Sequence, residues 1–177
     1  MQQRNYQREM DALIASLDAR PRLLLHSCCG PCSSACLERP HFDIDVFFYN
    51  PNILPAEEWE KRLFWQKHLL ETAPFGKNVG LIVPERDETA FRLAAAGLEA
   101  EAEGGARCTE CFVLRLSRTA EAAREGGYDY FATTLTVSPH KNAPLINAIG
   151  EKLADDHGVL WLPSGFKKRD GYRRSIE

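Results

Sequence analysis

The chain has 177 residues, of which 44% are hydrophobic and 27% are charged, and its formal net charge is −3. This balance fits one globular domain over residues 1–177 and excludes a disordered acidic or basic tail protein. The sequence has no apolar run long enough to cross a membrane, and its charged N-terminus excludes a secretory signal. We therefore expect a cytoplasmic protein, in which six cysteines favour metal or redox chemistry over a disulfide framework.

Hydrophobic periodicity predicts short apolar strands that alternate with helices. The first 20 residues are expected to form a helix that stops at Pro21, and the expected strands cover residues 22–27, 42–49, 79–83, 130–134 and 159–162. The other expected helices cover residues 33–38, 55–72, 88–96, 109–125 and 142–158, and residues 99–105 form a mobile acidic loop. This alternation predicts a Rossmann-like α/β domain, with a mainly parallel sheet and helices on both faces. A site is then expected at the C-terminal edge of the strands.

Five of the six cysteines fall into two groups. Cys28, Cys29 and Cys32 follow the first expected strand, and Cys108 and Cys111 open a helix. A two-residue spacer lets two sulfurs turn toward one ion, and two such pairs make a four-thiolate metal site. Zinc and an iron–sulfur cluster use the same thiolates, and the spacing does not choose between them. The sixth cysteine, Cys36, is expected in the core.

The segment Cys29-Gly30-Pro31-Cys32 also matches the dithiol of thioredoxin. A thioredoxin-like dithiol oxidoreductase that uses Cys29 and Cys32 is therefore one alternative. Two features weaken it, because Cys28 stands where the thioredoxin pattern has tryptophan and a second CxxC has no part in that mechanism. A zinc-stabilised RNA-binding module is the alternative that is not an enzyme.

Several segments, in a fixed order, carry a resemblance to one family. They are residues 24–32 (LLHSCCGPC), 49–53 (YNPNI) with Pro55 and Glu58, 103–112 (EGGARCTECF) with Arg115 and Leu116, and 133–135 (TTL). The order continues through Ser138-Pro139, Lys141-Asn142, Phe166-Lys167-Lys168, Gly171-Tyr172 and Arg174-Ser175. The chain resembles the cobalamin-independent epoxyqueuosine reductases of the QueH type, and the resemblance covers nearly everything after Arg22.

The resemblance implies an oxidoreductase that reduces epoxyqueuosine to queuosine at the tRNA wobble position. It also implies a [4Fe–4S] cluster, an adjacent mononuclear metal ion that we expect to be iron, and an external electron donor. Transferred residue by residue, Cys28, Cys29, Cys108 and Cys111 would bind the cluster, and Cys32 the adjacent metal. Members of the family continue into a C-terminal tail with a Cys-x-Cys pair, which is absent from this sequence.

Removal of an epoxide oxygen as water needs protons as well as electrons, so a proton donor is expected near the cysteines. The expected catalytic residues are Cys32, His26 and His140. His26 comes two residues before the first cysteine and could instead be a buried structural histidine. His140 lies in the loop before the helix at residues 142–158 and could instead be an exposed loop residue.

Polar and basic side chains on the loops of the same edge are expected to contact the tRNA. The candidates are Tyr49, Asn50, Asn52, Arg107, Lys141, Lys167, Lys168 and Arg174. Lys141 precedes a helix N-terminus, and such a terminus favours the binding of phosphate. Lys167, Lys168 and Arg174 belong to a basic C-terminal stretch. Tyr49 could stack on an unpaired base, whereas Asn50 and Asn52 either read the base or build the turn. Arg107 could contact phosphate or lower the pKa of a neighbouring thiol.

Overall fold

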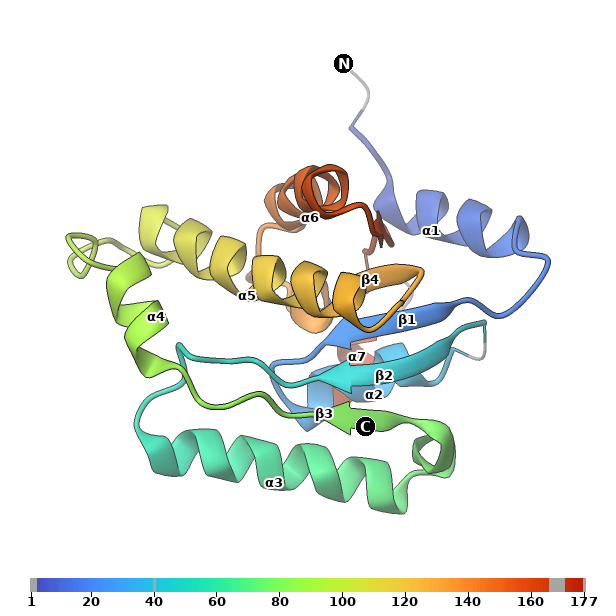
Figure 1. Ribbon diagram of the computed structural model, residues 1–177, viewed down its shortest axis with the longest axis horizontal. Coiled ribbons are helices and arrows are strands. Elements are labelled where there is room, and N and C mark those ends of the chain that lie inside the picture. The colour runs from blue at the N-terminus through green and yellow to red at the C-terminus, as the bar shows by residue number, and fades with distance from the viewer. Residues whose placement is uncertain (1–2, 40, 166–170, 177) are drawn as a thin grey trace.

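The computed structural model describes residues 3–39, 41–165 and 171–176 of the chain (Figure 1). Its strands are β1 (Arg22–His26), β2 (Asp43–Phe47), β3 (Gly80–Ile82), β4 (Tyr130–Thr133) and β5 (Leu160–Trp161). Its α-helices are α1 (Tyr6–Ala15), α2 (Gly30–Leu37), α3 (Ala56–Thr72), α4 (Glu88–Ala94), α5 (Ala106–Glu125), α6 (Ala143–His157) and α7 (Gly171–Ile176), and two 3-10 helices are η1 (Pro74–Asn78) and η2 (Thr134–Val137).

The strands form one sheet in the order β3-β2-β1-β4-β5, and every pairing is parallel. The predicted α/β fold is thereby confirmed, with a sheet that is entirely rather than mainly parallel. The chain leaves β1 toward one side of the sheet and later returns to β4 on the other side. In such sheets the C-terminal ends of the two strands at this reversal open a crevice for ligands. The cysteine turn that follows β1 lies at this reversal.

Two apolar layers cover the two faces of the sheet, as predicted. Residues of α5 and α6 pack with Leu24 and Phe131 on one face. Residues of α1, α2 and α3 pack with Leu23, Leu25 and Val46 on the other. Helices α5 and α3 accordingly lie on opposite sides of the strands in Figure 1. Because successive side chains of β1 alternate between two buried faces, an almost wholly apolar strand is what this position requires.

The boundaries differ from the predicted ones where short-range signals were ambiguous. Helix α1 ends at Ala15 rather than at Pro21, because the backbone turns at Ser16, whose N–H bonds the carbonyls of the last helical turn. Helix α5 begins at Ala106, three residues before the predicted start, with Gly105 as its N-cap. The helices η1, η2 and α7 were not predicted, since elements this short carry little periodicity. In the described part of the chain, no helix combines the length and apolar character needed to cross a bilayer.

Candidate metal centre and adjoining pocket

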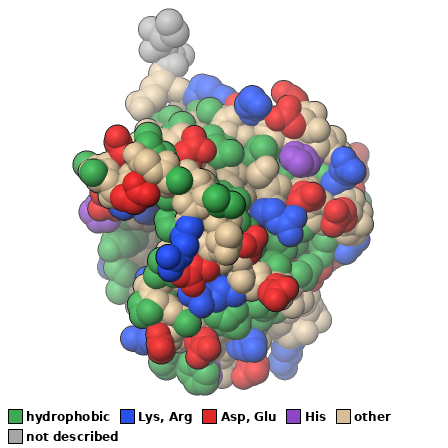
Figure 2. All heavy atoms as spheres, turned by 60° about the vertical axis from the view of Figure 1, so that its left-hand side comes forward, with side chains coloured by type: hydrophobic (Ala, Val, Ile, Leu, Met, Phe, Trp, Pro, Cys, Tyr) green, Lys and Arg blue, Asp and Glu red, His purple; other side chains and the backbone are tan. Residues whose placement is uncertain are grey.

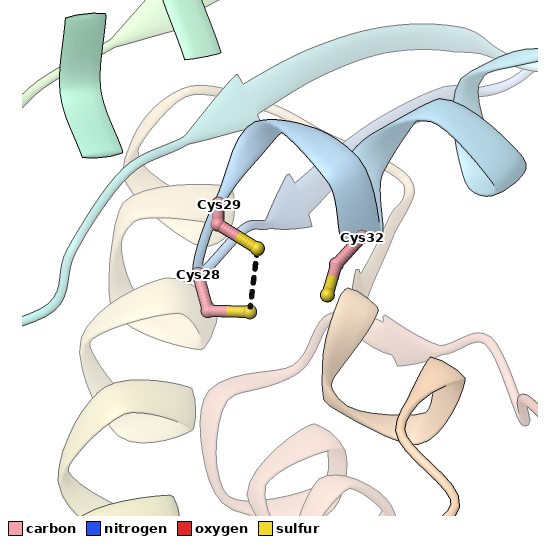
Figure 3. A group of neighbouring side chains, drawn as sticks. All are labelled: Cys28, Cys29 and Cys32. Carbon is pink, nitrogen blue, oxygen red and sulfur yellow. Dashed lines mark hydrogen bonds between the residues drawn. The ribbon is translucent and has the colours of Figure 1, made fainter. Parts of the chain in front are cut away.

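Three cysteine sulfurs converge directly after the central strand. Helix α2 begins at Gly30 with Cys29 as its N-cap and Pro31 in its first turn, a position where a missing N–H costs nothing. The Sγ atoms of Cys28, Cys29 and Cys32 all lie within 4.8 Å of one another and point toward a shared space (Figure 3). The Cys28 and Cys29 sulfurs are 3.8 Å apart. Two thiolates on one tetrahedral metal ion with bonds of about 2.3 Å are separated by a similar distance.

A buried network of side chains holds this cysteine turn. The hydroxyls of Ser27 and Ser33 lie 2.7 and 2.8 Å from Gln66 Oε1, and 3.1 and 3.0 Å from the carbonyl oxygen of Cys29. Ser27, Ser33 and Gln66 are each 0% exposed. Gly30 has no room for a side chain, because a Cβ there would lie 2.9 Å from the backbone oxygen of Trp65 in α3. Helices α2 and α3 therefore fix the turn before any metal binds.

The pKa values of the three thiols differ. Hydrogen bonds from Cys29 and Cys32 hold the pKa of Cys28 well below its usual range, and the positive charge of Arg115 acts in the same direction against burial. The interaction with Cys28 raises the pKa of Cys29 to about 11. The pKa of Cys32 is also raised, because its hydrogen bonds to Cys28 and Cys29 keep it protonated. Cys28 is thus the sulfur best prepared to act as a thiolate ligand.

His26 lies beneath the cysteines with both ring nitrogens engaged. Its Nε2 is 3.0 Å from the carbonyl oxygen of Tyr49, and its Nδ1 is 2.9 Å from the Thr133 hydroxyl. A carbonyl only accepts, so Nε2 carries the proton and Nδ1 accepts from Thr133. Burial lowers the pKa of His26 to about 4, and the charge of Arg115 adds to this effect. His26 thereby links the end of β1 to β4 and to Tyr49, two residues after the end of β2.

The second cysteine pair lies at the start of α5. Cys111 is buried and Cys108 is partly buried, and the Gly104 N–H lies 3.3 Å from the Cys108 sulfur. Neither belongs to the cysteine group after β1, which is the only set of three or more metal-ligating side chains within 4.8 Å among the described residues. A four-iron cluster is larger than a single ion, so its thiolates need not approach so closely. Cys36 is 2% exposed in the core, as predicted.

Cys108 and Cys111 line a cavity of about 330 Å³, referred to below as the α5 pocket. Its walls are formed by Asn52, Phe91, Arg107, Cys108, Cys111, Phe112, Arg115 and Lys141. Asn52 and Lys141 come from loops that follow β2 and β4, so the pocket lies at the predicted C-terminal edge of the sheet. Figure 2 brings this edge forward and shows basic and acidic side chains mixed on it. Of the lining residues, Lys141 forms an ion pair with Glu103, with Nζ 3.9 Å from Oε1.

Three of the predicted tRNA-contacting residues, Asn52, Arg107 and Lys141, therefore share one pocket, whereas Tyr49 and Asn50 do not line it. Tyr49 is 3% exposed and stacks on Phe47, as a core residue does. Asn50 is 1% exposed and donates from Nδ2 to the Ser27 carbonyl at 2.8 Å, so it helps to build the turn. His140 is exposed. Lys167, Lys168 and the side chain of Arg174 lie outside the described residues.

Sequence reasoning gave no role to several residues that shape the site. Gln66 is one polar position in an expected amphipathic helix, Ser27 ends the expected strand at residues 22–27, and Ser33 begins the expected helix at residues 33–38. Their network depends on how α3 packs against α2, which local patterns do not reveal. Arg115 was noted only as part of a matching segment, although its side chain is 4% exposed and lines the pocket. The spacing Cys108, Cys111, Arg115 places all three on one face of a helix and was the available signal.

Comparison with known proteins agrees with these features. A family model described as epoxyqueuosine reductase QueH matches residues 23–177. Epoxyqueuosine reductase QueH of Staphylococcus epidermidis is 43% identical over 182 residues, which cover 98% of this chain and 76% of the relative. The protein of the same name from Streptococcus pyogenes is 40% identical over 98% of this chain and 71% of the relative. The protein from Thermotoga maritima is 32% identical over 87% of this chain and 79% of the relative. The resemblance drawn from short segments is confirmed, and the chain belongs to the QueH family of epoxyqueuosine reductases.

Proposed function

We propose that this chain reduces epoxyqueuosine in tRNA to queuosine, with its active site at the cysteine turn and the α5 pocket. The observation that carries the proposal is the convergence of three sulfurs after β1, on a chain that places two further cysteines in the wall of a pocket at the same edge. In this reaction both carbon–oxygen bonds of the epoxide break and a carbon–carbon double bond forms. Two electrons from an external reductant and two protons are consumed, and the oxygen leaves as water.

The donor set fits an iron–sulfur cofactor. Cys28 and Cys29 would bind a [4Fe–4S] cluster together with Cys108 and Cys111, and Cys32 would bind an adjacent mononuclear metal ion, for which iron is our proposal. The support is chemical, since clustered thiolates at helix starts are typical ligands of such groups. When bound, the cluster supplies electrons one at a time, and the adjacent ion supplies a Lewis acid beside the epoxide.

The α5 pocket would hold the modified nucleoside. Phe91 and Phe112 give it an apolar wall that excludes water. Oδ1 of Asn52 is a buried acceptor without a partner in the described part of the chain, and it would accept a hydrogen bond from a substrate hydroxyl. Arg107 and Lys141 are partly exposed cations in the same wall and would pair with phosphates of the anticodon loop.

The remaining predicted residues enter as separate proposals. His140 would donate a proton, because it is exposed and adjoins the pocket residue Lys141. The same role for His26 would require it to release the Tyr49 carbonyl, so its observed bonds favour a positioning role. Lys167, Lys168 and Arg174 are proposed to attract the tRNA backbone through their positive charge. Tyr49 and Asn50 would contribute through the shape of the turn after β2 rather than by direct contact.

The dithiol alternative is less well supported by the same geometry. A thioredoxin-like mechanism uses a single CxxC pair. Here the Cys28 sulfur lies 3.8 Å from that of Cys29, and both lie within 4.8 Å of the Cys32 sulfur, so three sulfurs rather than one pair share the space. The zinc module remains the stronger competitor, because the separation of the Cys28 and Cys29 sulfurs also suits a single ion.

The deciding experiment uses the full chain, reconstituted with iron and sulfide in the absence of oxygen and then reduced chemically. The protein is incubated with tRNA that carries epoxyqueuosine, and the nucleosides are analysed by mass. We expect a brown protein and a product nucleoside that has lost one oxygen atom, with Cys36→Ala as a matched active control. A cluster-loaded protein that leaves the nucleoside unchanged would contradict the activity. A colourless protein with one zinc ion and no sulfide would instead favour the RNA-binding module.

A further inference from the structure

Arg115 is a buried cation without a described carboxylate partner. Its side chain is 4% exposed, in the third turn of α5. Its Nε lies 3.4 Å from the carbonyl oxygen of Cys111, and its guanidinium carbon lies 5.9 Å from the centre of the Phe112 ring. Neither contact neutralises the charge. Burial of an unpaired charge is costly, so such a group is expected to face an anion.

The other two cations of the α5 pocket are placed differently. Lys141 is partly exposed and pairs with Glu103, and Arg107 is partly exposed and donates to the Glu99 carbonyl at 3.2 Å. Both have protein or solvent partners. Arg115 alone of the three is buried, which separates it from residues suited to a solvent-facing phosphate.

The anion that Arg115 faces is indicated by its neighbours. Cys108 and Cys111 lie seven and four positions before it on the same helix face, and all three line the same pocket. Cys28, from the other group, packs together with Cys108 against the apolar cluster that includes Phe112 and Leu116 of α5. Cysteines of both groups, which are far apart in the sequence, therefore border the part of α5 that carries Arg115.

We propose that Arg115 is a positioning residue that supplies the fixed positive charge opposite the thiolates and the cluster they hold. This inference rests on the proposed function. Four thiolates carry more negative charge than the iron core offsets, and each added electron increases that charge. A nearby guanidinium, which stays protonated at every working pH, stabilises the reduced form more than the oxidised form. Arg115 thus raises the reduction potential of the bound cluster and helps to retain it.

The test compares Arg115→Gln and Arg115→Lys in the full, anaerobically reconstituted chain. Arg124→Gln is the matched control, since Arg124 is an exposed arginine on the same helix. Iron and sulfide content are measured first, and the reduction potential is then followed by visible absorption. We expect Arg115→Gln to have a more negative potential or a lower cluster content than wild type. Arg115→Lys keeps the charge, so its reduction potential and cluster content should stay closer to those of wild type. Arg124→Gln should have the same potential and cluster content as wild type.

The outcomes separate the possible roles. If the Gln and Lys variants behave alike, both as wild type or both depleted of cluster, charge is not what Arg115 contributes and the inference is overturned. A raised KM for tRNA with an unchanged reduction potential would show that Arg115 binds a phosphate of the tRNA, and this result would also overturn the inference. A wild-type chain that binds no cluster would instead overturn the proposed function, and this inference with it.

Discussion

The cysteines after β1 and the cysteines at the start of α5 have contrasting surroundings. The first group stands on a buried network that includes Gln66, and its helix presses against α3 at Gly30. The second group follows an acidic loop, and Gly104 just before it has a positive φ of 85° with open space around it. The first group is held by buried polar hydrogen bonds, whereas the second lies directly after a loop, on a helix held by the apolar packing of Phe112 and Leu116.

The largest expected effect comes from removing one sulfur from each group. Cys28→Ser and Cys111→Ser should both lose the proposed cluster, and activity should fall by at least about 100-fold, because each removes a proposed ligand. Iron and sulfide analysis of the purified variants provides the measurement, with Cys36→Ala as the control that keeps both. Normal iron content in Cys111→Ser would break the comparison, since the α5 cysteines would then not belong to the same assembly.

A matched pair of glycine substitutions probes how rigid each group is. Gly30→Ala forces a Cβ against the Trp65 backbone and should lower the free energy of unfolding by about 3 kcal/mol. The same substitution should also weaken metal binding. Gly104→Ala meets no neighbour, and its positive φ alone should cost about 1 kcal/mol. Chemical denaturation combined with iron content measures both effects. Equal losses of metal in the two variants would show that the two groups are equally constrained.

Buried His26, at the end of β1, predicts a dependence of stability on pH. Burial lowers the pKa of His26 from 6.5 to about 4, so the unfolded chain binds a proton between these values while the folded chain does not. Stability contributed by the neutral ring is complete above pH 6.5 and is lost as the pH falls toward 4, by about 2 kcal/mol at pH 5. Denaturation at pH 7 and pH 5 should show this loss in wild type and in His140→Gln, but not in His26→Gln. An unchanged slope in His26→Gln would contradict the prediction.

The smallest loss of stability is expected from a substitution in the hydrogen-bond network of Ser27, Ser33 and Gln66. Gln66→Leu removes an acceptor from the Ser27 and Ser33 hydroxyls, which keep the Cys29 carbonyl as an alternative, so the cost should be about 1 kcal/mol. The cysteine turn should also become more mobile, which thiol-reagent kinetics on the metal-free protein would detect as faster modification. His68→Ala, on the exposed side of α3, serves as the control. Identical rates in the two variants would mean that Gln66 does not hold the turn.

Much of the fold could be predicted because burial on both faces leaves a strong local signal. The apolar run Leu23, Leu24, Leu25 predicts a central strand, and Gly158 ends α6 in the left-handed conformation expected of a terminal glycine. The two-residue β5 and the 3-10 helices were harder, since their boundaries depend on tertiary packing. Within the site, the cysteine spacing predicted a convergence of sulfurs after β1, which Cys28, Cys29 and Cys32 show, while the ligand roles stay predictions. Buried Arg115 and Gln66 were missed as functional groups because a polar residue in an amphipathic helix is normally expected on the surface.

The position of β1 has a consequence for the order in which the enzyme matures. β1 pairs with β2 on one side and β4 on the other, so the geometry of the cysteine turn depends on strands from both halves of the chain. The polypeptide must therefore complete most of its folding before an inorganic group can be inserted. Unlike a zinc finger, which stays unfolded without its ion, this scaffold should already be assembled when the proposed metal group is delivered.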